Sequence, residues 1–264
     1  LTLRSQRLAQ GGPVEIGKKA TVSVDPGATI RLASPMQMTV EGRLNAWGGA
    51  IVLDEVRANT ALYAPQAHNR SIWIGDNAVL DVAGRAYSAL DAQGQRYGLA
   101  QAGGAIQLGG ALDWENGMPV QRRPADMHLV VRAGAVLDAS GSSVVLDQPA
   151  PENGRPSNAL TVASNGGSIV LGSANSMFLD GTLKAQAGGK GAAGGTLALT
   201  YNGGIYNRSQ ASAEVLTPRM LVLTQDKDGD SLADGTRPGD ALAYGKATLA
   251  VEQIQAGGFD NLSI

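Results

Sequence analysis

A short unit, Gly-Gly-x-φ-x-Leu, in which φ is an aliphatic residue, recurs along this chain of 264 residues. Four copies begin at Gly48, Gly103, Gly166 and Gly194, and a weaker fifth copy begins at Gly257. Aliphatic residues at alternate positions are typical of short strands that bury one face. Because a repeated unit places each copy above its neighbour, the repetition indicates stacked strands. We expect the paired glycines to supply positive φ angles and to let backbones approach closely at the corners.

Two longer blocks also recur. Residues 38–49 align with residues 177–189, and residues 77–84 align with residues 134–141. Both blocks alternate aliphatic with polar or small residues and then break at Gly, Asn or Asp, and no segment carries a sustained helical stripe. An antiparallel sandwich and a stacked solenoid both fit such strands, and the repeated blocks favour the solenoid. The sequence therefore predicts an all-β fold, a right-handed parallel β-helix (solenoid) with about eight to ten coils.

Composition narrows the class of protein further. Glycine supplies 36 residues, aromatic residues 4% and charged residues 17%, while a hydrophobic share of 43% is enough for a continuous core. A formal net charge of −2 gives no electrostatic case for binding nucleic acid or an anionic membrane. The chain has no cysteine, which excludes disulfides and thiolate metal sites and suits a protein exported unfolded. No apolar run approaches the ~20 residues of a membrane span.

The composition also shifts at several places along the chain. These shifts predict insertions near residues 54–70, 85–102, 111–127, 147–158 and 201–240. We expect a single elongated β-helical domain over residues 1–264, decorated by these insertions. The start at Leu1, without a methionine or a signal peptide, indicates a fragment of a larger protein.

Three blocks carry a resemblance to a known family. Residues 71–84, 130–141 and 163–171 resemble the filamentous haemagglutinin-like exoproteins of two-partner secretion. The resemblance implies an adhesin that is secreted or held at the cell surface of a Gram-negative bacterium, with an outer-membrane transporter as secretion partner. It also implies a role in cell adhesion or biofilm through a host-cell receptor, matrix or glycan. The family's secretion domain carries Asn-Pro-Asn motifs, and no Asn-Pro occurs here, so the chain resembles internal shaft.

An acidic loop near the end of the chain is the sharpest local motif. It places carboxylates at alternate positions, and the predicted calcium ligands are Asp226, Asp228, Asp230, the carbonyl of Leu232, and Asp234. Alternate side chains of this kind can converge on one Ca²⁺ ion. Ser231 stands where an EF-hand has glycine, and Arg237 stands where it has a bidentate glutamate, so the alternative is an acidic loop that water solvates.

The few aromatic residues are the candidates for ligand binding. Trp73, Tyr87, Tyr97 and Trp114 lie in or near the predicted insertions. Exposed aromatic rings can stack on sugars, and a cluster on one face would indicate glycan binding. The alternative is that each ring covers an edge of the core under its own loop.

Catalysis has less support in the sequence. The two histidines, His68 and His128, are isolated, and we expect His128 at the surface or at the end of a strand. Asp81 and Asp138 recur at equivalent positions, which predicts a structural role because an active site needs only one copy. The sequence thus predicts no enzyme. The alternative is a polysaccharide lyase or hydrolase whose carboxylates come from the insertions, such as Asp54-Glu55, Asp113 and Glu115.

Overall fold

The computed structural model describes most of the chain, namely residues 1–4, 12–56, 69–110, 112–115, 118–121, 124–148, 158–202, 218–227 and 231–264. Of residues 112–115 and 118–121 only the backbone is described. Strands dominate, and within the described ranges α1 (Val251–Ala256) is the only helix. The prediction of an all-β fold is therefore confirmed.

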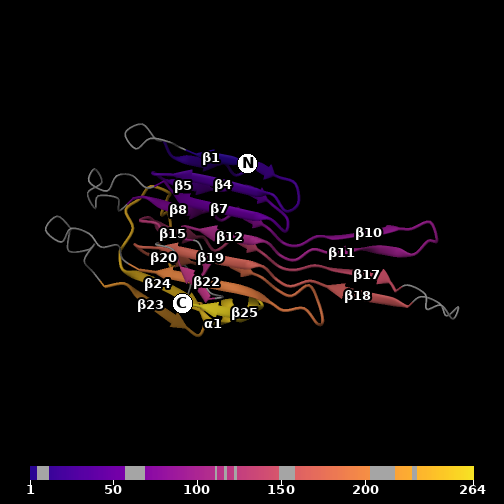
Figure 1. Ribbon diagram of the computed structural model, residues 1–264. Helices are drawn as coiled ribbons and strands as arrows, with labels where there is room; N and C mark the ends of the chain where they lie inside the picture. Colours follow the sequence, from indigo (N-terminus) through magenta and orange to yellow (C-terminus); the bar gives the residue numbers. More distant parts are fainter. Residues whose placement is uncertain are drawn as a thin grey trace.

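Three parallel sheets make up most of the structure (Figure 1). In the order of their hydrogen-bonded neighbours, sheet A contains β1 (Thr2–Arg4), β4 (Thr29–Ser34), β7 (Ala50–Glu55), β12 (Ala105–Leu108), β19 (Ser168–Ser173), β22 (Gly195–Tyr201) and β25 (Phe259–Ser263). Sheet B contains β2 (Val14–Ile16), β5 (Met38–Val40), β8 (Ser71–Ile74), β15 (His128–Val131), β20 (Met177–Leu179), β24 (Lys246–Ala250) and β23 (Met220–Thr224). Sheet C contains β21 (Thr182–Lys184), β16 (Val136–Asp138), β9 (Val79–Asp81), β6 (Arg43–Asn45) and β3 (Thr21–Ser23).

The chain visits the three sheets in a fixed rotation. From β1 to β22 it adds one strand to sheet A, then one to sheet B, then one to sheet C, and returns to sheet A. Sheets A and B each have seven described strands, fewer than the eight to ten coils that we expected. Three antiparallel hairpins leave the sheets: two lie inside the predicted insertions 85–102 and 111–127, and the third includes residues outside 147–158 that the expectation assigned to coils. They are β10 (Ala86–Leu90) with β11 (Arg96–Ala100), β13 (Leu112–Glu115) with β14 (Met118–Gln121), and β17 (Ser143–Asp147) with β18 (Ala159–Ala163).

The repeated unit of the sequence stacks on itself in sheet A. Its four clear copies form β7, β12, β19 and β22, which are consecutive neighbours in one register. The φ position forms a buried ladder, and so does the leucine position; the φ ladder, with its equivalent in β4, is Ile30, Ile51, Ile106, Ile169 and Leu197. All five side chains of this ladder are 0% exposed and join aliphatic residues from sheets B and C in one core. Burying each such side chain contributes about 1.5–3 kcal/mol, so the ladders account for much of the stability.

The paired glycines serve close packing more than unusual backbone angles. A Cβ atom on Gly49 would collide with the carbonyl oxygen of Ala28, and one on Gly104 would collide with the carbonyl oxygen of Gly49. The same relation continues along the stack at Gly167. Among the four clear pairs, only Gly48 has a positive φ, of 60°. The expected close approach is therefore present, and the expectation of positive φ angles was wrong for the other pairs.

The connections between sheets differ in where they carry extra residues. The hairpins β10–β11 and β17–β18 both lie between a strand of sheet C and the next strand of sheet A, and both extend away from the three sheets (Figure 1). The hairpin β13–β14 lies between sheets A and B, and the predicted insertion 54–70 falls there too, largely outside the described residues. The predicted insertion 147–158 lies mostly outside the described residues, between β17 and β18. The predicted insertion 201–240 contains β23, a strand of sheet B.

The last coil departs from the rotation. β23 precedes β24 in the sequence, yet it lies beyond β24 at the edge of sheet B. After β24 the chain forms α1, which contacts β21, the edge strand of sheet C, and then β25 in sheet A. The side-chain amide of Gln253 in α1 donates hydrogen bonds to the carbonyl oxygens of Leu179 and Gly181. The helix thus stands where a further strand of sheet C would otherwise lie.

Candidate functional site

The hairpins β10–β11 and β17–β18 lie side by side and are joined by an ion pair. The Arg96 Nη2 atom lies 3.0 Å from Asp147 Oδ1, and the backbone N–H of Arg96 donates to Asp147 Oδ2 at 2.8 Å. The side-chain hydrogen bond to Arg96, followed by the backbone hydrogen bond, lowers the pKa of Asp147. The same side-chain contact raises the pKa of Arg96. At the base of the hairpins, the hydroxyls of Ser142 and Ser164 both donate to the carbonyl oxygen of Gln101, at 2.8 and 2.7 Å.

The first hairpin presents an aromatic face to solvent. Tyr87 pairs with Leu99, and Ala89 pairs with Tyr97. Residues directly opposite each other in an antiparallel pair point to the same face, so both tyrosines lie on one face as diagonal neighbours. Tyr87 is 44% exposed and Tyr97 is 59% exposed, with Leu99 at 54%. We call Tyr87, Tyr97 and Leu99 the tyrosine face.

The other two predicted ligand-binding residues are not part of the tyrosine face. Trp73 lies in β8 and is only 3% exposed, because Leu232 and Leu242 pack in the same cluster with Val130. Trp73 therefore packs on the outside of sheet B under a distant segment of the chain, whereas the alternative that the sequence left open was burial under its own loop. Trp114 belongs to β13, and its side chain lies outside the described residues.

The acidic loop is anchored to sheet B by contacts that need no metal ion. The backbone N–H and the hydroxyl of Ser231 donate to the carboxylate of Asp180, at 3.0 and 2.5 Å. The backbone N–H of Lys227 donates to Glu252 Oε1 at 2.8 Å. Asp180 is 4% exposed and was not among the residues that the sequence singled out. The apolar Leu232 and Leu242 inside a polar loop were the signal that this loop packs against the sheet.

The predicted calcium ligands are only partly described. Asp226 and Asp234 are exposed, and Leu232 is 8% exposed with its side chain turned into the cluster around Trp73. Asp228 and Asp230 lie outside the described residues. In the part of the chain that is described, no group of three or more His, Cys, Asp or Glu side chains could hold a metal ion. The calcium site thus stays a prediction.

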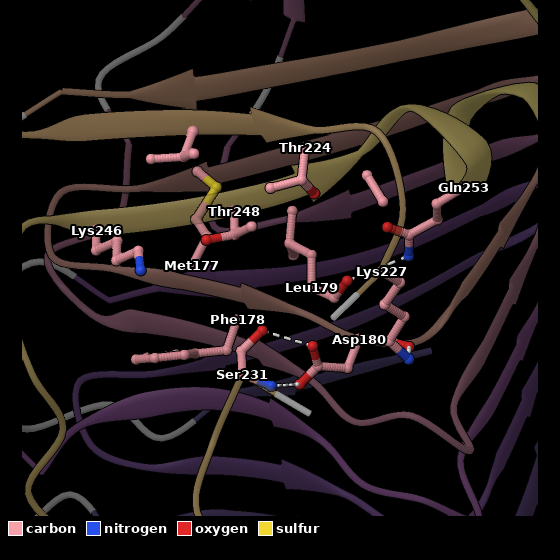
Figure 2. A pocket seen from close by; sticks show the side chains of 12 residues that line it. Met177, Phe178, Leu179, Asp180, Thr224, Lys227, Ser231, Lys246, Thr248 and Gln253 are labelled. Atoms are coloured by element: carbon pink, nitrogen blue, oxygen red, sulfur yellow. Dashed lines mark hydrogen bonds between the residues drawn. The ribbon is translucent and has the colours of Figure 1, made fainter. Parts of the chain in front are cut away.

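A pocket of about 340 Å³ lies beside this anchored loop (Figure 2). Its walls come from β20, β23, β24, α1 and the loop. The lining residues are Met177, Phe178, Leu179, Asp180, Val222, Thr224, Lys227, Ser231, Lys246, Thr248, Ala250 and Gln253. Hydroxyl groups and two lysines therefore share the pocket with an aromatic ring and short aliphatic side chains.

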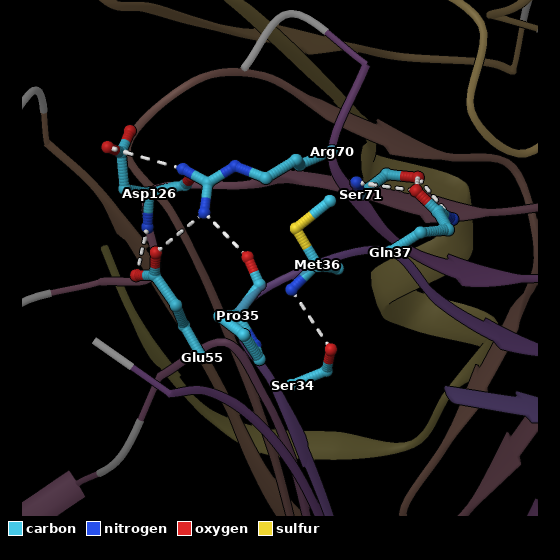
Figure 3. A network of polar contacts seen from close by, with 8 residues as sticks. All are labelled: Ser34, Pro35, Met36, Gln37, Glu55, Arg70, Ser71 and Asp126. Atoms are coloured by element: carbon cyan, nitrogen blue, oxygen red, sulfur yellow. Dashed lines mark hydrogen bonds and ion pairs between the residues drawn. The ribbon is translucent and has the colours of Figure 1, made fainter. Parts of the chain in front are cut away.

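A buried polar network ties together the connections from sheet A to sheet B (Figure 3). Arg70, 8% exposed, donates to the carbonyl oxygens of Pro35 and Asp126, both at 2.9 Å. Its Nη1 atom also lies 3.2 Å from Glu55 Oε1, while Glu55 Oε2 accepts the backbone N–H of Asp126 at 2.9 Å. The network joins segments far apart in the sequence, so it acts as a structural clamp. Only the position of Arg70 directly before a strand could have signalled it.

The carboxylates considered for catalysis have structural partners. Glu55 belongs to the clamp, and Asp54 pairs with Arg31 at 3.1 Å. Asp81 and Asp138 make the same turn contact, each accepting the backbone N–H two residues ahead, at 3.0 and 2.9 Å. This matches the structural role expected from their recurrence. The side chains of Asp113 and Glu115 lie outside the described residues.

His128 corrects one expectation. We expected it at the surface or at a strand end, and it does begin β15, but it is 0% exposed. Its ring lies 5.0 Å from the ring of Tyr244, which belongs to the segment that follows the acidic loop and covers the outside of sheet B. The strand-end alternative is therefore confirmed and the surface alternative is wrong, because the sequence does not show which segment returns to cover that face. His68 lies outside the described residues.

Comparison of the chain with known proteins finds no similar protein. No protein-family model, no curated protein and no solved structure matches the chain. Searching the described residues for a helix long and apolar enough to cross a membrane finds none.

Proposed function

We propose that this chain is a stretch of right-handed parallel β-helix that serves as a structural and adhesive shaft segment of a large secreted bacterial surface protein. The observation that carries the proposal is the rotation of the chain through sheets A, B and C around one aliphatic core. Successive turns of such a path form a solenoid. The strong preference of parallel crossover connections for the right hand supports the handedness.

The resemblance to filamentous haemagglutinin-like exoproteins supports the proposal that this shaft belongs to an adhesin. In that reading the full-length protein passes an outer-membrane transporter of the two-partner type and reaches the cell surface or the medium. A solenoid that grows by one strand per sheet at each turn suits a spacer, because its length is set by the number of coils.

Adhesion would be carried by the elements that leave the stack. The tyrosine face is the surface we propose for binding glycan or matrix, because two exposed aromatic rings lie on one face of a hairpin. That hairpin is held at its base by Gln101 and along its edge by Asp147. Such anchoring limits the conformational entropy that binding costs.

A glycan array and a cell-adhesion assay on this chain test the adhesive part. Tyr87→Ala with Tyr97→Ala should abolish binding, whereas Tyr87→Phe with Tyr97→Phe should retain most of it, because the rings stay. Leu223→Ala, at an exposed residue of β23 far along the stack from this hairpin, is the control and should bind as the unchanged chain does. Binding that survives loss of both rings would leave the tyrosine face without a role.

A further inference from the structure

One column of side chains on the outer face of sheet B changes character along the stack. In register, this column is Thr39, Trp73, Val130, Phe178, Thr248 and Val222. Leu232 and Leu242 cover Trp73 and Val130. After Phe178 the column drops to a threonine and a valine, and the pocket opens over those two residues. The pocket therefore forms where the side chains of the column become smaller than Phe178.

The pocket is lined by apolar, hydroxyl and charged groups. The ring of Phe178 and the side chains of Val222 and Ala250 supply carbon surface, while Thr224 and Thr248 supply hydroxyls (Figure 2). Lys227 and Lys246 bring two positive charges, and Asp180 brings one negative charge.

Among the described residues, the carboxylate of Asp180 and the ammonium group of Lys227 have hydrogen-bond partners, whereas the ammonium group of Lys246 has none. Ser231 donates twice to the carboxylate of Asp180, and the ammonium group of Lys227 donates to the Asp180 carbonyl oxygen. Lys246 is exposed and makes no ion pair with any described residue. The described lining thus offers a ligand the ammonium group of Lys246, hydroxyl groups, and the ring of Phe178.

We propose that this pocket binds an acidic sugar residue, a uronic or sialic acid. Its carboxylate would pair with Lys246, its hydroxyls would exchange hydrogen bonds with Thr224 and Thr248, and its carbon face would lie against Phe178. The volume of about 340 Å³ falls in the range of small-molecule sites and suits one or two sugar residues. The site is separate from the tyrosine face, so it stands or falls independently of the adhesion proposed above.

Titration of the folded chain with glucuronic acid and with N-acetylneuraminic acid, followed by NMR or calorimetry, tests the proposal. Glucose and the methyl ester of glucuronic acid are the neutral probes, and inorganic sulfate is the anion probe. We expect the acids to bind at least about tenfold more tightly than the neutral sugars, since a charge-assisted contact is lost in the latter. Sulfate that binds as tightly as the acids would overturn the proposal in favour of a general anion site.

Two variants locate the binding. Lys246→Gln should weaken binding of the acids about tenfold, and Lys190→Gln, at an exposed turn elsewhere, should leave it unchanged. Thr248→Phe should fill the pocket as Phe178 fills the previous level, and should abolish binding while the melting temperature is retained. Unchanged binding in Lys246→Gln, or in a folded Thr248→Phe variant, would overturn the assignment.

The same experiment separates a free or terminal sugar from one inside a polysaccharide. Oligosaccharides with internal uronates are titrated beside the monosaccharides. Binding of the monosaccharide supports a pocket for a terminal residue, and binding of the oligosaccharide alone, lost in Lys246→Gln, supports the same chemistry within a chain. Absence of both at millimolar concentration sinks the proposal. Adhesion through the tyrosine face would be unaffected by that result.

Discussion

The connections from sheet B to sheet C and those from sheet C to sheet A contrast sharply. Each of the former is a short turn of two to four residues, namely 17–20, 41–42, 75–78, 132–135 and 180–181. Backbone hydrogen bonds join the ends of these turns to the strand ends of the neighbouring coils. At this corner a Cβ on Gly42 would collide with the carbonyl oxygen of Ala20, and one on Gly134 would collide with that of Asp76. The corner from sheet C to sheet A instead carries the hairpins β10–β11 and β17–β18.

The two corners thus have different roles: one supports the stacked sheets, and the other carries strands that are exposed to solvent. The tight corner and the ladders fix the spacing of the coils, whereas the open corner admits extra strands whose apolar side chains stay in contact with solvent. Leu90 is 65% exposed and Tyr97 is 59% exposed in the first hairpin, while Ile106 in the neighbouring strand of the stack is 0% exposed. Apolar side chains are thus exposed in the hairpin and buried in the strand of sheet A that follows it.

The largest expected effect comes from breaking a ladder. Ile106→Ala should lower the free energy of unfolding by about 2–5 kcal/mol, because it leaves a cavity between Ile51 and Ile169. Leu90→Ala, in the exposed hairpin, should change it by less than about 0.5 kcal/mol. Urea unfolding of both variants measures the difference. Equal losses would mean that the hairpin is as much a part of the core as the ladder.

Calcium binding to the acidic loop would stabilise the stacked sheets rather than the hairpins, because the loop covers sheet B. At a hundredfold excess of Ca²⁺ over its dissociation constant, the ion would stabilise the fold by about 2.7 kcal/mol. The melting temperature should rise with calcium relative to chelator, and the rise should vanish in Asp226→Ala with Asp228→Ala. The same melting temperature with calcium and with chelator would favour the solvated loop.

A methyl group at the glycine contacts should cost less. Gly104→Ala should destabilise the fold by about 1–3 kcal/mol, because the new Cβ meets the backbone of Gly49. Gly17→Ala, where nothing lies within 4 Å and φ is not positive, is the matched control and should be nearly neutral. Thermal unfolding compares the two, and a neutral Gly104→Ala would show that the coils are not packed as tightly as described.

The smallest effect concerns the ion pair between the hairpins. The pKa of Asp147 is lowered in the folded chain, so its contribution is present above the unfolded pKa of about 3.9 and is lost as the pH falls through the folded value. The protection factor of the Arg96 amide, which compares its exchange rate with the intrinsic rate at the same pH, should therefore fall as the pH drops through the folded pKa of Asp147. Asp147→Asn should show low protection at both pH values. A protection factor that does not change with pH in the unchanged chain would remove the role of the pair.

The stacked strands could be predicted from the sequence because each coil repeats the same local pattern. Ile51, Ile106 and Ile169 occupy equivalent places in the repeated unit, and they are neighbours in sheet A. The recurrence of Asp81 and Asp138 likewise gave their shared role in the turn. Periodicity in the sequence becomes proximity in such a structure because equivalent positions of the repeated unit lie in register in neighbouring strands.

Contacts that occur at a single place in the structure, and do not recur from coil to coil, could not be predicted in the same way. The clamp around Arg70 joins residues from three separate segments, and Asp180 meets Ser231 only because the acidic loop folds back over sheet B. The burial of His128 and Trp73 also depends on the acidic loop and the segment after it, which fold back over sheet B. Of the candidate ligand-binding residues whose side chains are described, the structure unites only Tyr87 and Tyr97, since they lie in one hairpin.

The position of β23 has a consequence for the order in which the chain can fold. Earlier coils can be added one by one from the N-terminus, because each new strand finds its predecessor already in place. β23 emerges before β24 but pairs only with β24 in sheet B, so it has no neighbour in that sheet until about twenty further residues have followed. We therefore expect the last coil to close in one concerted step rather than by the addition of one more strand.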